Sequence, residues 1–321
     1  MAIDRTDVEF VSGDIVCRAW RYRPSVANGA CIVMAHGLGG LRSASLDAYA
    51  QRFAEAGFAV LLFDYRHFGA SSGEPRQLVS VRRQLADWAA AVAYARAIPG
   101  VDANRVALWG TSFSGGHVVV TAARDARVAA LCAQGPMMDG LSASLNIVRY
   151  AGLGQLLRLA ARGLADAVRA LTGRERLLVP LVAAPGALAT MSTPDAEPGY
   201  RAIVGPDWVN GICASFALGL AFYRPVAVAR RVRCPALIIV ANDSVAPAAA
   251  AVRTAKRIGP QCELHEFAMG HFDIYLGEGF ERGVTLQTEF LLRTLSRSAS
   301  ERANQMSTAP MESAMAALVP H

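Results

Sequence analysis

The stretch Val-Ala-Leu-Trp-Gly-Thr-Ser-Phe-Ser-Gly-Gly-His-Val, residues 106–118, decides the fold of this 321-residue chain. Its first four residues are apolar, as in a buried strand, and residues 113–123 continue as a helix of small residues. Between them Ser112 is flanked, two positions away on each side, by the small residues Gly110 and Ser114. Small neighbours are required where a serine is held in a strained turn between a strand and the helix packed on it. The stretch therefore predicts a strand–turn–helix with a nucleophilic serine at its apex.

Three further motifs surround this stretch, and each follows a strand-like apolar or alternating run. They are His-Gly-Leu-Gly-Gly at 36–40 after the run 30–35, Asn-Asp-Ser-Val-Ala-Pro at 242–247 after 235–241, and Met-Gly-His-Phe at 269–272 after 263–267. The order along the chain is therefore a glycine-rich loop, the serine, an acid and a histidine.

This order resembles the α/β-hydrolase family, in which serine, acid and histidine follow one another along the chain. The resemblance covers about residues 8–297, and an Asp-x-Arg-x-x-Gly-x-Ser loop at 64–71 adds to it. It implies the α/β-hydrolase fold, a mostly parallel central sheet flanked by helices. The alternation of strand-like and helical runs along the chain agrees with such a sheet, covered on both faces.

The resemblance assigns a role to each site residue. Ser112 is the expected nucleophile, and His271 the base that takes its proton, because a serine hydroxyl is too weak an acid to attack unaided. Asp243 is expected to orient and support the imidazolium. The backbone N–H groups of Leu38 and Phe113 are expected to form the oxyanion hole.

Several alternatives compete with these assignments. Asp139, just after the sixth strand-like run, is the rival acid. Asp273 is too close to His271 in sequence, and Asp64 is better suited to holding its own loop through Arg66. Ser114 also fits the small–x–Ser–x–small pattern, but placing it at the apex would start the helix late.

The alternation of strands and helices stops after Pro136 and resumes at Cys234. Residues 137–225 between them are rich in Leu, Ala and Arg and indicate helices at 153–171 and 209–222. In the family that the chain resembles, an insertion after the sixth strand is a cap over the active site. We therefore expect a core from 1–136 and 226–297, a largely helical cap at 137–225, and a disordered tail at 298–321.

Composition limits the partners and cofactors. The net charge is +6, and Lys256 is the only lysine. The arginines are scattered rather than gathered in a stripe with aromatic residues, so no nucleic-acid partner is indicated. The sequence lacks a complete dinucleotide-binding loop, a phosphate loop and an HExxH motif, so neither a cofactor nor a metal is expected.

Six widely spaced cysteines favour free thiols in a reducing compartment. The amino terminus has no apolar signal segment, and the longest stretch with few charges, 177–191, is too short for the ~20 apolar residues that span a bilayer. We expect a cytoplasmic protein with no stable membrane insertion, and the sequence leaves a homo-oligomer open.

The expected function is a serine hydrolase that cleaves a carboxylic ester of a moderately hydrophobic small molecule. Thioesterase, peptidase and carbon–carbon bond hydrolase chemistry would use the same triad. A peptidase for free amino termini needs a buried acidic anchor, for which the inserted segment offers Asp166, Glu175, Asp195, Glu197 and Asp207. A different class, a non-catalytic binding protein of this fold, usually has a broken triad.

Overall fold

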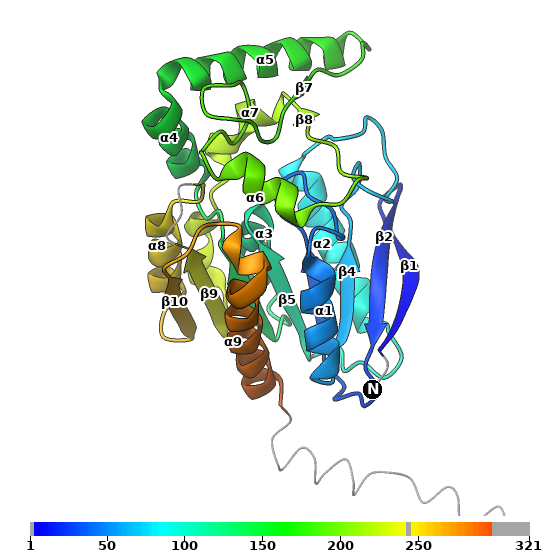
Figure 1. Cartoon of the computed structure of the whole chain (residues 1–321). Coiled ribbons are helices and arrows are strands. Elements are labelled where there is room, and N and C mark those ends of the chain that lie inside the picture. Colours follow the sequence, from blue (N-terminus) through cyan, green and yellow to red (C-terminus); the bar gives the residue numbers. More distant parts are fainter. Residues whose placement is uncertain (1–2, 242–244, 297–321) are drawn as a thin grey trace, which may run out of the picture.

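The computed structural model describes residues 3–241 and 245–296. An eight-stranded sheet runs through its lower half, with helices in front of it and behind it (Figure 1). The strands are β1 (Asp4–Ser12), β2 (Ile15–Arg23), β3 (Cys31–Ala35), β4 (Ala59–Phe63), β5 (Val106–Thr111), β6 (Ala130–Gln134), β9 (Ala236–Ala241) and β10 (Cys262–Phe267). Their order across the sheet is β1-β2-β4-β3-β5-β6-β9-β10.

Strand direction divides the sheet into two parts. β1 and β2 form an antiparallel hairpin, and β2 joins β4 antiparallel, whereas all other neighbours are parallel. Every residue of β3, β5, β6 and β9 is buried, while burial alternates along most of β1. Parallel strands covered on both faces require continuous apolar runs, and this is why these segments are recognisable in the sequence.

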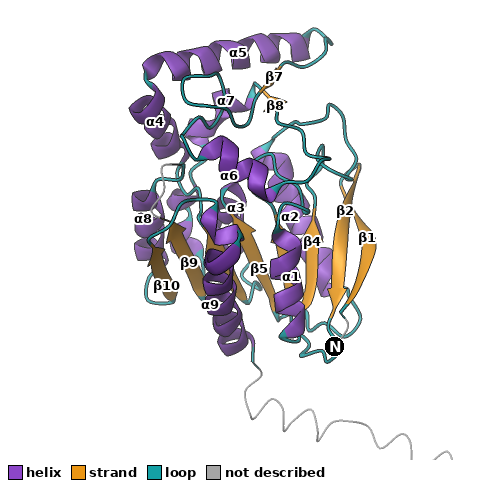
Figure 2. Ribbon diagram, in the orientation of Figure 1, coloured by secondary structure: helices purple, strands orange, loops and turns teal. Residues whose placement is uncertain are grey.

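Helices cover both faces of the sheet (Figure 2). α1 (Leu46–Glu55) and α9 (Gly277–Leu295) pack together on one face. The other face carries α2 (Val81–Arg96) and α3 (Phe113–Arg124), and α8 (Ala248–Ile258) packs there against β9 and β10. No helix in the described ranges is long and apolar enough to cross a membrane.

The inserted segment lies above the end of the sheet where the parallel strands terminate (Figure 1). It contains α4 (Gly140–Ala151), α5 (Leu153–Leu171), β7 (Leu178–Val179), α6 (Ala196–Ile203), β8 (Ile212–Cys213) and α7 (Phe216–Gly219). The helix predicted at 153–171 is confirmed as α5. Whether the core and cap divide where the sequence analysis placed them stays a prediction, and the tail at 298–321 lies outside the described residues.

The helix predicted at 209–222 is wrong over its first half. Residues 212–213 pair with β7, and the N–H groups of Cys213 and Ala214 donate to the carbonyl oxygens of Gln77 and Leu177. Only the short helix α7 and a 3₁₀ turn at Leu220–Phe222 are helical. Backbone bonds to distant segments override the local helix preference here.

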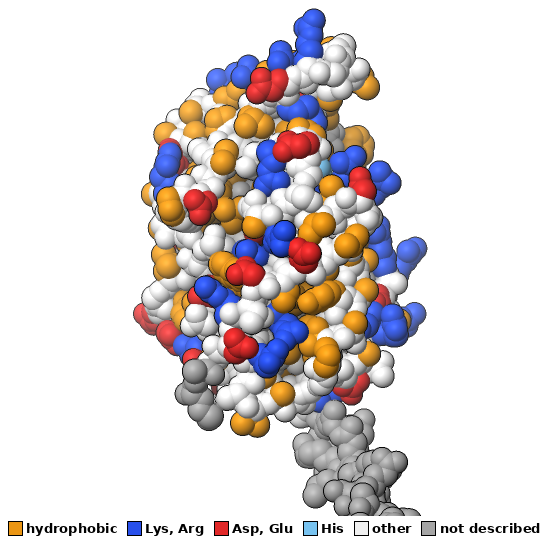
Figure 3. All heavy atoms as spheres, turned by 90° about the vertical axis from the view of Figure 1, so that its right-hand side faces the viewer, with side chains coloured by type: hydrophobic (Ala, Val, Ile, Leu, Met, Phe, Trp, Pro, Cys, Tyr) orange, Lys and Arg blue, Asp and Glu red, His pale blue; other side chains and the backbone are white. Residues whose placement is uncertain are grey.

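Charged side chains are mixed on the face shown in Figure 3. Basic side chains (Lys and Arg) lie from the top to the bottom of that face, with acidic and apolar side chains among them. The absence of a nucleic-acid partner stays a prediction.

Candidate active site

Ser112 occupies the turn between β5 and α3. Its φ of 54° and ψ of −119° are a conformation that residues with a side chain rarely adopt. Gly110 must lack a side chain, because a Cβ there would lie 2.4 Å from the carbonyl oxygen of Ser114. The N–H of Ser112 donates to the carbonyl of Gln134 (2.8 Å), and its own carbonyl accepts from the N–H of Met137 (2.9 Å). The strand–turn–helix predicted around Ser112 is confirmed.

Ser114 is buried inside the molecule rather than at the turn. Its side chain is fully buried, and its Oγ lies 2.7 Å from the hydroxyl of Tyr65. Tyr65 in turn accepts a hydrogen bond from Nε1 of Trp88 at 2.7 Å. Ser112 lines two cavities, whereas the Ser114 side chain is fully buried and bound to Tyr65, so the geometry favours Ser112 as the nucleophile.

His271 lies beside Ser112. It belongs to the loop after β10, and its Nε2 is 3.1 Å from Oγ of Ser112, within hydrogen-bond distance. The ring is almost entirely buried and packs edge-on against Phe272, with ring centroids 5.0 Å apart. Gly270, next to it, is held by a 2.7 Å hydrogen bond from its N–H to the Asp273 carboxylate. The structure thus brings the predicted nucleophile and base together.

The predicted acid, Asp243, lies outside the described residues. β9, the strand before it, is parallel to β10, and Ala241 at its end pairs with Phe267 at the end of β10. The acid motif and the histidine motif therefore follow neighbouring strands.

The rival acid, Asp139, is engaged at the base of the inserted segment. Its carboxylate accepts bonds from the Arg224 guanidinium at 2.9 and 3.1 Å and from the N–H of Leu141, which caps α4. Burial alone would raise the pKa of the Asp139 carboxyl, but its hydrogen bonds, above all those from Arg224, outweigh burial and lower the pKa. Asp139 and Arg224 thus join the two ends of the insertion.

Asp64 holds its loop, but not through the expected partner. Its carboxylate accepts from the N–H of Arg42 at 2.7 Å, and the Arg42 guanidinium lies 3.4 Å away. Arg66 instead pairs with the buried carboxylate of Asp87 at 2.6 Å. The predicted Asp64–Arg66 interaction is wrong, because Asp87 comes from the distant helix α2 and its proximity is not visible in the sequence.

The two predicted oxyanion donors lie at the same cavity as Ser112. Within the described residues, neither the N–H of Leu38 nor that of Phe113 has a hydrogen-bond acceptor. The loop of Leu38 passes so close to the elbow that a Cβ on Gly37 would lie 2.9 Å from Cβ of Ser112. This arrangement leaves two N–H groups available to a ligand beside the serine hydroxyl.

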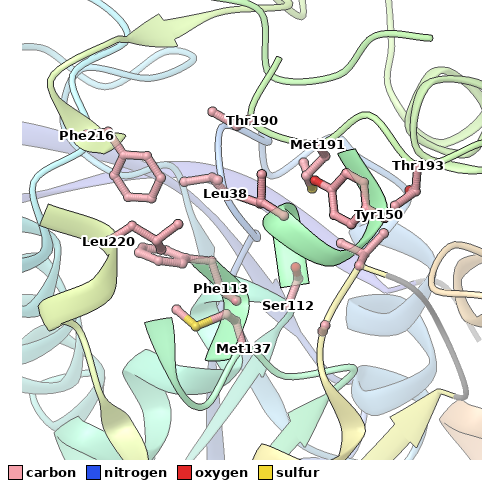
Figure 4. A pocket seen from close by; sticks show the side chains of 14 residues that line it. Leu38, Ser112, Phe113, Met137, Tyr150, Thr190, Met191, Thr193, Phe216 and Leu220 are labelled. Carbon is pink, nitrogen blue, oxygen red and sulfur yellow. The ribbon is translucent and has the colours of Figure 1, made fainter. Parts of the chain in front are cut away.

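An apolar cavity of about 70 Å³ opens above Ser112 (Figure 4). The Ser112 side chain points up from its floor, and Leu38 lies above it. Phe113, Met137, Phe216 and Leu220 form one side, and Tyr150, Met191 and Thr193 the other. Most of these walls come from the inserted segment. None of the described lining residues is charged.

A second cavity of about 20 Å³ adjoins the first and shares Leu38, Ser112 and Met191 with it. Its other walls include the aromatic residues Tyr200, Phe272 and Tyr275, and His271 lines this cavity but not the larger one. His36, also in its wall, is buried, and burial lowers the pKa of its imidazole. Among the residues described, no cluster of three His, Cys, Asp or Glu side chains is placed to hold a metal.

Comparison with known proteins places the chain in a family. Residues 27–275 match the family model described as serine aminopeptidase, S33. The chain belongs to the S33 family of α/β-hydrolases. It is therefore an enzyme, and its hydrolase fold, predicted from the sequence, is confirmed.

Relatives of this S33 hydrolase carry several names. The quorum-quenching protein AidA of Acinetobacter baumannii is 45% identical over 291 residues, which are 89% of this chain and 94% of that protein. The polyketide transferase af380 of Aspergillus fumigatus is 28% identical over 91% of this chain and 99% of that protein. The thiohydrolase aneE of Aspergillus aculeatus is 36% identical over 134 residues, 42% of each protein.

Solved structures share the fold over nearly the whole chain. The α/β-hydrolase GrgF from Penicillium superposes with a TM-score of 0.79 and 26% identity, covering 92% of this chain and all of GrgF. DcsB, solved with a substrate analogue, has the same TM-score at 24% identity and covers 91% of this chain.

The sequence analysis missed most of the cavity walls. Thr190, Met191 and Thr193 lie in an irregular stretch between β7 and α6, where no periodicity marks the residues that face inward. Tyr200 and Phe216 come from short helices of eight and four residues. The only available signal was the apolar composition of the insertion.

Proposed function

We propose that this S33 hydrolase cleaves carboxylic esters of hydrophobic acyl groups through an acyl-enzyme intermediate, with Ser112, His271 and Asp243 as its triad. The observation that carries the proposal is the 3.1 Å contact between Nε2 of His271 and Oγ of Ser112 at the floor of an apolar cavity. An activated serine nucleophile requires a base at this distance.

The reaction follows from these groups. Ser112 Oγ attacks the ester carbonyl as His271 takes its proton, and the N–H groups of Leu38 and Phe113 stabilise the negative oxygen of the tetrahedral intermediate. His271 then delivers the proton to the departing alcohol. A water molecule attacks the acyl-enzyme in the same way and releases the acid. Asp243 orients the imidazole throughout.

The two cavities orient the substrate. His271 must reach the oxygen of the leaving alcohol, and it lines only the smaller cavity. The alcohol therefore occupies the smaller cavity and the acyl chain the larger one. Each methylene buried in the larger cavity contributes ~0.8 kcal/mol to binding. Ile147, Tyr150 and Met191 supply part of its apolar wall, so the inserted segment acts as a cap on the acyl site.

An aminopeptidase activity lacks support at this site. It would need a buried carboxylate to bind a free ammonium group, and none of the described residues that line either cavity is acidic. Asp166, a buried acid of the insertion, is neutralised by Arg176 through bonds of 2.6 and 2.8 Å, and Asp139, also buried there, is paired with Arg224. Glu197 pairs with Arg201 at 2.9 Å.

The names of two relatives suggest which other substrate bonds should be tested for cleavage. A quorum-quenching relative suggests acylated lactones, which combine a cyclic ester with an acyl chain. A thiohydrolase relative suggests acyl thioesters. An acyl thioester has its acyl group and its leaving thiol on either side of one carbonyl, as the two-cavity arrangement would accommodate. In a lactone the leaving oxygen stays tethered to the acyl part, so both parts of the opened product remain one molecule.

The test is active-site labelling with a fluorophosphonate probe, followed by hydrolysis of p-nitrophenyl esters of increasing acyl length. Tryptic cleavage after Arg105 and Arg124 releases one peptide that holds both Ser112 and Ser114. We therefore compare Ser112→Ala with Ser114→Ala. Labelling and hydrolysis should vanish in the first and persist in the second. Labelling that survives Ser112→Ala would refute the proposal. Acyl thioesters and acylated lactones, assayed in parallel, rank the bond types.

A further inference from the structure

The glycine-rich loop 37–40 is held by two aromatic side chains of the inserted segment. The hydroxyl of Tyr200 donates to the carbonyl oxygen of Leu38 at 2.6 Å, and Nε1 of Trp208 donates to the carbonyl oxygen of Gly39 at 2.9 Å. The two rings are stacked, with centroids 5.0 Å apart and an interplanar angle of 23°. The contacts join residues more than 160 positions apart in the sequence.

The loop has little internal support of its own. Three of its four residues are glycines, which have wide backbone freedom, and Gly39 has a φ of +61°. Its one internal backbone bond in the described structure, from the N–H of Gly40 to the carbonyl of Gly37, is 3.3 Å long. The insertion fills the space beside it, since a Cβ on Gly39 would lie 2.9 Å from the Leu181 side chain.

The same part of the insertion also packs on the histidine loop. A Cβ on Gly199 of α6 would lie 2.3 Å from the ring of Phe272, and the Tyr200 ring meets Phe272 edge-on at 5.7 Å. Phe272 is the neighbour of His271 in sequence and packs against its ring. α6 therefore touches both the loop that carries the N–H of Leu38 and the loop that carries the base.

We propose that Tyr200 and Trp208 are positioning residues that fix the N–H of Leu38 in the direction required of an oxyanion donor. Fixing the carbonyl oxygens of Leu38 and Gly39 restricts rotation on the carboxyl side of Leu38 and so limits the orientations open to the loop. The inserted segment then helps to build the catalytic site in addition to lining the acyl cavity. This inference rests on the proposed role of Leu38 in ester hydrolysis.

Tyr200 is suited to this task because its hydroxyl stays protonated. Burial raises the pKa of the Tyr200 phenol, so at neutral pH the group is a donor and its bond to the Leu38 carbonyl is maintained. The indole N–H of Trp208 is a donor at every pH.

The experiment compares Tyr200→Phe, which removes only the hydroxyl that binds the loop, with Trp208→Phe, which keeps an aromatic ring but removes the indole N–H together with part of the ring that stacks on Tyr200. Tyr94→Phe is the matched control, because Tyr94 lies on α2 against Phe10, away from both cavities. We measure kcat and KM for a p-nitrophenyl ester, the Ki of a trifluoromethyl ketone, which needs the oxyanion donors to form its tetrahedral adduct, and the melting temperature.

The proposal predicts about a tenfold fall in kcat for each variant, with KM within twofold of wild type. Complete loss of an oxyanion donor lowers kcat by about 10²–10³-fold, and a smaller fall is expected here because the donor is only misaligned. The Ki of the ketone should rise in parallel. The double variant should lose less than the product of the two single losses, because both bonds act on one loop. Tyr94→Phe should match wild type.

Two outcomes would overturn the proposal. An unchanged kcat and ketone Ki in both single variants would show that the loop keeps its orientation without these bonds. A rise in KM alone would make Tyr200 a substrate contact in the smaller cavity. If the proposed hydrolase function itself were wrong, wild type would show no Ser112-dependent turnover, so the two failures are distinguishable. If one variant does not fold, the other still decides.

Discussion

Asp139 and Asp243 both follow strands at the carboxyl edge of the sheet, so the sequence alone offers either as the acid partner of His271. The structure gives Asp139 another partner. Its carboxylate is almost fully buried at the start of α4 and pairs with Arg224 from the far end of the insertion. A buried carboxylate already engaged by a guanidinium and a backbone N–H has few lone pairs left for an imidazole.

Because only one of the two carboxylates is expected to support His271, substitution of Asp243 and of Asp139 should have different effects on kcat. We expect Asp243→Asn to lower kcat by about 10⁴-fold, because an amide cannot support the imidazolium that forms during attack. Asp139→Asn should leave kcat within about threefold of wild type, since it removes no group from the reaction. It should lower the melting temperature, because the Arg224 guanidinium loses its ionised partner.

Steady-state kinetics and thermal unfolding monitored by circular dichroism measure both effects. The reverse pattern, with kcat lost in Asp139→Asn and kept in Asp243→Asn, would assign the acid to Asp139. Circular dichroism spectra equal to that of wild type serve as the control for folding.

At the scale of single elements, helix α4 shows how an insertion can shape an acyl site. Ala143, Ile147 and Tyr150 recur at intervals of four and three residues and line the larger cavity, so one face of the helix meets the substrate. Leu141 and Leu145, on the same helix, are 42% and 61% exposed. The helix therefore offers an inward site for changing specificity and an outward site for a matched control.

We expect Ile147→Trp to shorten the longest acyl chain that the enzyme accepts. The indole would occupy space in a cavity of about 70 Å³, and a mismatch of one methylene already changes kcat/KM by ~10–200-fold. Esters with long acyl chains should lose at least about tenfold in kcat/KM, while short esters stay near the wild-type value.

The comparison is a chain-length series of p-nitrophenyl esters on Ile147→Trp and Leu145→Trp. The Leu145 variant adds the same indole to the exposed side of α4 and should keep the wild-type profile. Equal profiles for wild type and Ile147→Trp would place the acyl chain elsewhere.

At the scale of the whole molecule, buried histidines link stability to pH. His117 on α3 is fully buried between Tyr223 and Gln84, with Nε2 3.0 Å from Oε1 of Gln84. Burial lowers the pKa of the His117 imidazole from 6.5 to about 3. The folded chain therefore keeps this imidazole neutral over a range in which the unfolded chain protonates it.

The sign of the effect follows from this difference. Above pH 6.5 the His117 imidazole is neutral in both the folded and the unfolded chain. As the pH falls from 6.5 toward 3, only the unfolded chain binds this proton, so the free energy of unfolding falls. Between about pH 6 and pH 5 the free energy of unfolding should fall, with a slope from this one group approaching ~1.4 kcal/mol per pH unit. His117→Gln should flatten the dependence by that amount.

Urea unfolding at a series of pH values measures the slope. His265→Gln is the control, because it makes the same replacement at a histidine whose side chain is 40% exposed on β10. An unchanged slope in His117→Gln would mean that His117 is not held neutral in the folded state.

Much of the fold could be predicted from local signals. The elbow around Ser112 depends on residues within a few positions of one another, and the parallel strands are buried on both faces and so appear as apolar runs. The order of the motifs along the chain then implied which loops meet at one edge of the sheet. For the nucleophile and the base, that expectation agrees with the 3.1 Å contact in the structure.

The sequence by itself thus determined the strand–turn–helix around Ser112 and the buried parallel strands, because steric limits at the turn and burial along each strand act over short distances. The resemblance to the α/β-hydrolase family implied the fold and the role of His271 as the base. Only the tertiary structure decided that Asp64 pairs with Arg42, that Asp139 joins the ends of the insertion, and that Tyr200 and Trp208 hold the Leu38 loop. Those contacts join residues from 22 to 169 positions apart. Which residues become partners depends on how the helices and the insertion pack, and no periodicity in the sequence indicates that packing.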